Sequence, residues 1–152
     1  MNVLVYGAGA IGSHIAYCMH SAGHTVFLLA RGEHFSKMKQ NGLHIKILDN
    51  QKLKDEKTIK EGPRFFTIDS LDQINSRDLD YIFITVKLSS YTPDNIKNLQ
   101  PYMGDDTAIV PPCTKLPFWW FYNFDGVLDS KYNNFDFDPG LSQYFPGENI
   151  IG

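Results

Sequence analysis

The sequence has few of the features that mark secreted or membrane-embedded proteins. It carries only two cysteines, Cys18 and Cys113, which form no C-x-x-C pair and fit a reduced intracellular protein. No apolar run approaches the roughly 20 residues of a membrane span. No signal peptide precedes the first strand-like segment, which begins almost at Met1. These absences predict a cytoplasmic protein that does not enter a membrane.

Clustered basic charge is also absent, because the net charge is −3 and the lysines are scattered along the chain. Without a basic field, nucleic acid is not expected as a partner. His20 and His24 are four residues apart, but Gly23 interrupts the helical pattern between them, so no metal site is predicted. At 152 residues and 43% hydrophobic, the chain can bury one core without disulfides or metal.

The most informative feature that is present is a glycine triplet. Gly7, Gly9 and Gly12 form the pattern G-x-G-x-x-G between an apolar segment over residues 2–6 and a helical pattern that ends near Ala22. A dinucleotide-binding βαβ unit has this order. Gly7 permits a tight turn, Gly9 lets backbone N–H groups approach a pyrophosphate, and Gly12 lets the helix pack on the strand. The alternative is a turn that packs a helix on a sheet and binds nothing; the flanking segments favour nucleotide binding.

Apolar and amphipathic segments alternate along the rest of the chain. Strands are predicted over residues 2–6, 25–30, 43–47, 80–86 and 107–110, and helices over 11–22, 33–40 and 93–99. Residues 49–63 are predicted to form a hairpin or loop outside the main sheet, and residues 149–151 to open one more strand. The face of the first helix that packs on the sheet is predicted to consist of Ile11, Ile15, Cys18, Met19 and Ala22. Buried strands that alternate with helices predict an α/β fold of the Rossmann type, with a doubly wound, mainly parallel sheet and helices on both faces.

Arg31 indicates which dinucleotide this unit would bind. It ends the second apolar segment, where NAD-binding versions of the fold place an acid that holds the adenosine ribose. A guanidinium instead suits a 2′-phosphate, which favours NADP. Glu33 could be the missing acid by spacing alone, but it is interpreted as a first-turn helix residue. Alternatively, Arg31 is an exposed loop charge without a role in binding.

Lys87 is the first charge after the apolar strand over residues 80–86. It therefore lies at the carboxyl end of that strand, where ligands bind in open α/β sheets. Its ammonium could hold a substrate carboxylate or polarise a carbonyl. Equally, Lys87 could only mark where solvent begins.

These residues resemble a known family. Residues 1–41, with GAGAIGSHIA and AGHTVFLLARGEH, resemble the N-terminal domain of ketopantoate reductases (2-dehydropantoate 2-reductases). Residues 80–87 resemble the family's central strand with its lysine. Residues 110–122 and 138–140 resemble a subfamily whose members carry an aromatic Pro-Trp-Trp-Tyr-like run and an Asp-Pro-Gly. The resemblance implies hydride transfer from NADPH to a small-molecule 2-oxo acid, with Lys87 near the nicotinamide and substrate. The cofactor-binding residues that it implies are Gly7, Ala8, Gly9, Ala10, Ile11, Gly12, Arg31, Lys87 and Thr114.

The sequence departs from the family pattern in two places. The family usually carries Asn-Gly after the fifth strand, where this chain has Thr114-Lys115, and a hydroxyl cannot reproduce the hydrogen bonding of an amide. The family also has a C-terminal helical domain that supplies a catalytic lysine and a substrate-binding glutamate, whereas this chain ends at Gly152. Residues 1–152 are therefore expected to be an NADP-binding domain without reductase turnover of its own.

Two further alternatives stay open. The chain could be a nucleotide-sensing regulatory domain without catalysis, although such domains usually carry an acid at the position of Arg31, or a fragment that binds no ligand. The aromatic segment over residues 118–121 could join two copies in a homodimer or fold back as ordinary core.

Overall fold

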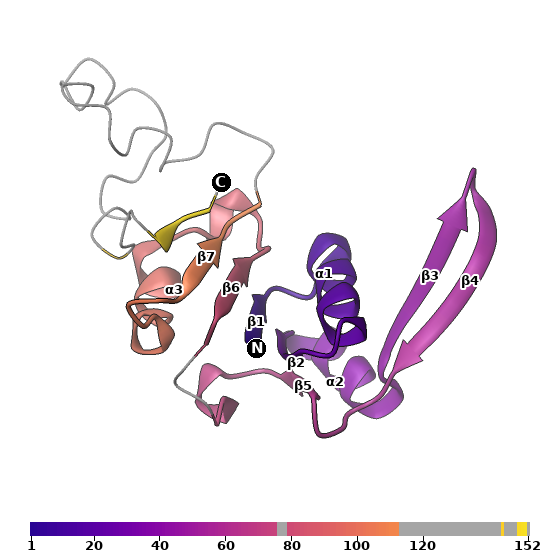
Figure 1. The fold of residues 1–152 in the computed structure, drawn as a ribbon, viewed down its shortest axis with the longest axis horizontal. Helices are drawn as coiled ribbons and strands as arrows, with labels where there is room; N and C mark the ends of the chain where they lie inside the picture. Colours follow the sequence, from indigo (N-terminus) through magenta and orange to yellow (C-terminus); the bar gives the residue numbers. More distant parts are fainter. Residues whose placement is uncertain (76–78, 113–143, 145–148, 152) are drawn as a thin grey trace, which may run out of the picture.

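The protein is built on a five-stranded parallel sheet (Figure 1). The computed structural model describes residues 1–75, 79–112, 144 and 149–151. The strand order is β5-β2-β1-β6-β7, and the strands are β1 (Asn2–Tyr6), β2 (Thr25–Leu29), β5 (Phe65–Ile68), β6 (Tyr81–Ile84) and β7 (Ala108–Val110). Counted along the sheet's own strands this is the order 3-2-1-4-5, with every neighbouring pair parallel. The predicted doubly wound α/β fold is confirmed.

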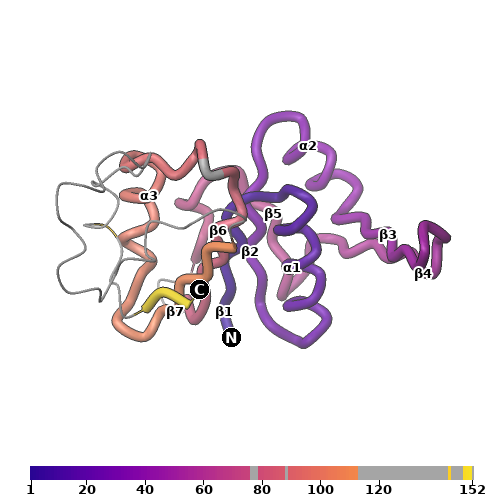
Figure 2. Tube along the Cα trace, turned by 90° about the horizontal axis from the view of Figure 1, so that it is seen from above, coloured from indigo at the N-terminus to yellow at the C-terminus, as the bar shows by residue number. Residues whose placement is uncertain are grey.

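Helices cover both faces of this sheet. Seen from above, α1 (Ala10–Ser21) and α2 (Gly32–Asn41) lie on one side of the strands and α3 (Pro93–Lys97) on the other (Figure 2). Three short 3-10 turns complete the described chain: η1 (Leu71–Gln73), η2 (Leu88–Ser90) and η3 (Gln100–Tyr102). None of the helices in the described ranges is long and apolar enough to cross a bilayer.

The sheet separates two hydrophobic cores. In β1, Val3 and Val5 belong to the core that includes Ala16 of α1, whereas Leu4 and Tyr6 belong to the core that includes Ile96 of α3. Successive strand residues point to opposite faces, so a strand buried on both sides is apolar throughout. The alternation also directs Tyr6, the last residue of β1, toward the α3 side.

A long antiparallel hairpin projects from the body of the molecule (Figure 1). It consists of β3 (Leu43–Asp49) and β4 (Lys52–Ile59), and it is a separate two-stranded sheet, as predicted for this region. Asn50 and Gln51 turn the chain with φ values of 47° and 65°. Lys57 holds the pKa of Asp55 below its ordinary value through a side-chain hydrogen bond, and Asp55 raises the pKa of Lys57 in turn.

Three expectations need correction. No element is predicted between residues 64 and 79, yet Phe65–Ile68 forms β5, a four-residue edge strand that pairs with β2. In α1 the fully buried residues are Gly12 and Ala16; the expected core residue Ile11 is 61% exposed, and Cys18 and Ala22 are also exposed. Ile15 and Met19, also expected there, are partly buried and pack against the core. At position 12 only glycine fits, because a Cβ atom would overlap the Gly7 carbonyl and Thr85 hydroxyl oxygens. The third helix ends at Lys97 rather than near residue 99.

Candidate functional site

The glycine turn between β1 and α1 is shaped by close contact with the loop after β6. Gly7 has a φ of 121°, which side chains rarely tolerate. A Cβ atom at Gly12 would overlap the carbonyl oxygen of Gly7 and the hydroxyl oxygen of Thr85. The Thr85 hydroxyl donates a hydrogen bond of 2.6 Å to the Gly7 carbonyl and thereby joins the end of β6 to the turn. Gly7 and Gly12 are therefore required by the fold itself.

Gly9 differs from the other two glycines. It is the N-cap of α1, has ordinary φ and ψ values of −71° and −174°, and a Cβ built on it would meet no described heavy atom within 4 Å. Internal packing thus gives no reason for a glycine at this position. The first N–H groups of an α-helix have no acceptor within the helix and carry partial positive charge. The turn therefore leaves open space in front of a helix end of the kind that suits an anion.

Arg31 lines the same pocket as the glycine turn and lies at the start of α2. It follows β2 by two residues and is the N-cap of α2, with an exposed side chain. Its Nη2 atom donates a hydrogen bond of 3.0 Å to the Tyr6 hydroxyl, and its Cζ atom lies 5.9 Å from the centre of the Tyr6 ring. The guanidinium is thus held against the end of β1.

Two adjoining pockets lie along the carboxyl edge of the sheet. The smaller, of about 260 Å³, is lined by the glycine turn (Gly7, Ala8 and Gly9), by His34 at the start of α2, and by Val86, Ser90 and Asn95 after β6. The larger, of about 840 Å³, is lined by the segment that follows β5 and by residues of α3 and η3. Both pockets share three residues: Tyr6, Leu29 and Arg31.

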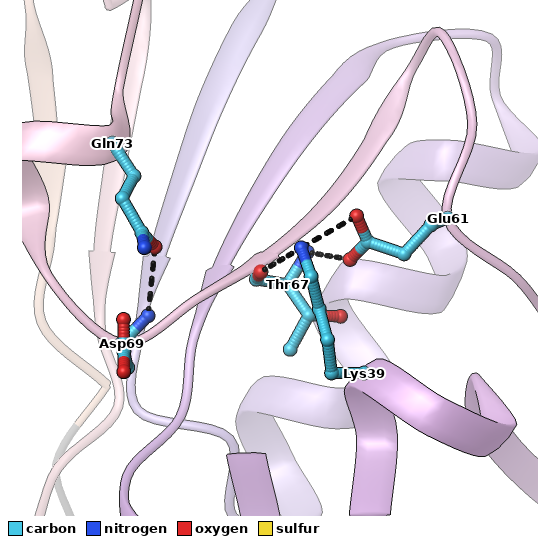
Figure 3. Close-up of polar contacts among 5 residues, drawn as sticks. All are labelled: Lys39, Glu61, Thr67, Asp69 and Gln73. Carbon is cyan, nitrogen blue, oxygen red and sulfur yellow. Dashed lines mark hydrogen bonds and ion pairs between the residues drawn. The ribbon is translucent and has the colours of Figure 1, made fainter. Parts of the chain in front are cut away.

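Polar contacts hold strand β5 and the segment that follows it, of which Asp69 lines the larger pocket (Figure 3). The Asp69 N–H donates a hydrogen bond of 3.1 Å to the Gln73 side-chain oxygen. Before β5, Glu61 accepts a hydrogen bond of 2.6 Å from the Thr67 N–H. The Glu61 carboxylate also forms an ion pair of 2.8 Å with Lys39 of α2. Lys39 also donates to the Thr67 carbonyl at 3.1 Å. Strand β5 and helix α2 are therefore held together by three residues that line neither pocket.

The structure brings most of the predicted site residues together. Gly7, Ala8, Gly9 and Arg31 line one pocket, and Gly12 lies buried beneath it. Ala10 and Ile11 form the exposed first turn of α1. Lys87 is exposed in the loop after β6, next to the lining residue Val86 but in the lining of neither pocket. Thr114, Lys115, the aromatic segment and residues 138–140 lie outside the described residues.

Several site residues were not predicted from the sequence. Tyr6 and Thr85 are the clearest, because one borders both pockets and the other holds the glycine turn. A usable signal existed for Thr85, which is the first hydroxyl after a wholly apolar strand. The residues after β5 carried no signal, since that strand itself was not predicted.

Comparison with known families accounts for this arrangement. A sequence model described as "Ketopantoate reductase PanE/ApbA" matches residues 3–112, from β1 through β7. The chain belongs to this family. It is 26% identical over its whole length to a 2-dehydropantoate 2-reductase of Mesorhizobium japonicum, of which it covers 44%. The chain thus spans less than half the length of this curated relative.

Solved structures of similar proteins share the fold. The structure is similar to 2-dehydropantoate 2-reductase from Geobacter metallireducens, with a TM-score of 0.67 and 18% identity over 100% of this chain and 40% of that one. It is similar also to D-mandelate dehydrogenase in a ternary structure with NADH and anilino(oxo)acetate, with a TM-score of 0.65 and 19% identity over 99% of this chain and 39% of that one. At these identities the likeness shows the fold.

Proposed function

We propose that the chain is the NADP(H)-binding part of a ketopantoate-reductase-like oxidoreductase. The parent reaction is hydride transfer from NADPH to the ketone of a 2-oxo acid such as 2-dehydropantoate. One observation carries the proposal: the glycine turn, with open space at Gly9, and the Arg31 guanidinium line the same small pocket. A pyrophosphate fits the former and a 2′-phosphate the latter.

The two pockets suggest how the cofactor lies. The small pocket would take the pyrophosphate, on the N–H groups at the start of α1. The large pocket has room for the adenosine, between the segment after β5 and helix α3. Arg31 lines both pockets, so its guanidinium would meet the 2′-phosphate of a cofactor that spans them. When bound, the cofactor supplies the hydride.

Lys87 is proposed to act on the substrate side. It follows β6, the neighbour of β1 across the point where the strand order reverses, and ligands of open α/β sheets bind outside the strand ends at that point. An exposed ammonium there could hold the carboxylate of a 2-oxo acid or polarise its ketone. We propose further that residues 1–152 alone bind cofactor without turnover, because the resemblance assigns the proton donor to the family's C-terminal domain.

The choice between NADP and NAD rests on Arg31 and is open to direct test. Titrations with NADPH and NADH, followed by fluorescence or calorimetry, should give tighter binding of NADPH. One charge-assisted hydrogen bond is worth about 1.5–3 kcal/mol, or roughly ten- to a hundredfold in affinity, and Arg31→Ala should remove most of that preference.

Arg64→Ala is the matched control. Arg64 is an exposed arginine whose Nη1 donates to the Gly23 carbonyl at 2.9 Å, and it lines neither pocket. Its loss removes the same charge and should leave the ratio of the two affinities unchanged. Equal affinities of the unmodified chain for NADPH and NADH would refute the proposed cofactor.

A further inference from the structure

The contact between Tyr6 and Arg31 joins a buried residue to an exposed one. Tyr6 ends β1, between β2 and β6, and is only 3% exposed. Arg31 is an exposed residue at the start of a helix, and a long side chain of this kind ordinarily samples many rotamers. The hydrogen bond of 3.0 Å and the ring contact at 5.9 Å tie the exposed Arg31 guanidinium to a buried residue of the sheet.

The surroundings of Arg31 offer it a competing position. Asp69 and Asp72 line the larger pocket together with Arg31 and would attract its charge. Within the described ranges the guanidinium forms an ion pair with neither acid, and its side-chain hydrogen bond goes to Tyr6 instead. A guanidinium has five N–H donors, so this bond leaves four for a ligand.

We propose that Tyr6 is a positioning residue for cofactor selectivity. Its hydroxyl holds the Arg31 guanidinium at the junction of the two pockets, away from Asp69 and Asp72, where the remaining donors can meet a 2′-phosphate. This inference rests on the proposed NADP preference. Its physical basis is preorganisation, because an arginine that is already held loses less conformational freedom when the phosphate binds.

Tyr6→Phe tests the inference with a minimal change, since it removes one oxygen and keeps the ring. The affinity of the 152-residue chain for NADPH should fall, while its affinity for NADH, which has no 2′-phosphate, stays within about twofold. The ratio of the two affinities should therefore fall by about three- to tenfold, the range expected for one ordinary hydrogen bond. A general loss of structure would weaken both cofactors alike.

Two further variants make the test specific. Tyr91→Phe removes the same atom from another buried tyrosine, which donates to the Ile84 carbonyl at 2.7 Å and lines neither pocket, so it should leave the ratio unchanged. In an Arg31→Ala background, Tyr6→Phe should have no further effect on the ratio, because the two residues act as one unit. Additive effects of the two substitutions would overturn the proposal.

The remaining outcomes are distinguishable from a failure of the proposed function. A wild-type chain without NADPH preference refutes both the cofactor assignment and the role of Tyr6. A wild-type chain that prefers NADPH and keeps its ratio in Tyr6→Phe refutes the role of Tyr6 alone. If Tyr6→Phe does not fold, Arg31→Lys serves instead, because it keeps the charge but removes the planar guanidinium that Tyr6 holds. The ratio of NADPH to NADH affinity should then fall. An unchanged ratio would contradict the proposal.

Discussion

Gly9 and Gly12 lie three residues apart but are glycines for different reasons. A side chain at Gly12 would collide with the Gly7 carbonyl and the Thr85 hydroxyl, both of which are held by their mutual hydrogen bond. A side chain at Gly9 would meet nothing of the described chain within 4 Å. Gly12 therefore serves the packing of helix on strand, whereas we propose that Gly9 keeps space for the cofactor.

The pair Gly12→Ala and Gly9→Ala should separate stability from binding. We expect Gly12→Ala to destabilise the fold by about 1–3 kcal/mol, as overpacking of a tight contact does. Gly9→Ala should cost no more than about 1 kcal/mol, the difference between glycine and alanine at an N-cap, yet weaken NADPH binding at least tenfold. Denaturant unfolding gives the first quantity and cofactor titration the second. Undiminished NADPH affinity in Gly9→Ala would show that no ligand approaches the backbone there.

At the scale of whole elements, the attachment of β5 and α2 depends on a partly buried carboxylate. Glu61 accepts hydrogen bonds from the Thr67 N–H and from Lys39, and its side chain is 30% exposed (Figure 3). By contrast, the ion pair between Glu33 and Lys37 within α2 is 81% and 67% exposed. The two glutamates thus allow a comparison of ion pairs in different settings.

Glu61→Ala should destabilise the protein by about 1–3 kcal/mol, because the backbone N–H of Thr67 loses its acceptor in a partly buried position. Glu33→Ala, the control, should cost less than about 1 kcal/mol, as exposed ion pairs usually do. Unfolding midpoints in urea at constant slope measure both. Equal costs for the two variants would mean that the Glu61 contacts add nothing beyond a surface pair.

The elements that could be predicted are those whose own residues form a clear local pattern. β1, β2 and β6 are continuous apolar runs, and the helix predicted from residue 93 begins at Pro93, after Thr92, whose hydroxyl accepts a hydrogen bond from the Asn95 N–H. β5 was missed because four residues at a sheet edge carry too little pattern. The Tyr6–Arg31 contact was also missed, since it joins residues 25 positions apart through strand pairing that only the folded sheet creates.

For the whole molecule, the order of the strands determines where a ligand can act. The chain moves from β1 outward to β2 and β5, then crosses back to β6 on the other side of β1. The helices that follow β1 and β6 consequently pack on opposite faces of the sheet, and residues from both halves of the sheet line the pockets at its carboxyl edge. A dinucleotide in these pockets would contact the glycine turn, the start of α2 and the segments after β5 and β6, which come from both halves of the sheet.

Such a ligand should stabilise the fold as a unit. A ligand that binds only the folded state at a hundred times its dissociation constant adds about 2.7 kcal/mol, which for a domain of this size raises the unfolding temperature by roughly 5–10 °C. We therefore expect NADPH to raise the Tm of the chain, and NADH at the same concentration to raise it less. Most of the difference should be lost in Arg31→Ala, and both shifts should shrink in Gly9→Ala, which leaves the folded state intact. Differential scanning calorimetry measures these shifts; an unchanged Tm in saturating NADPH would contradict a dinucleotide site along this edge of the sheet.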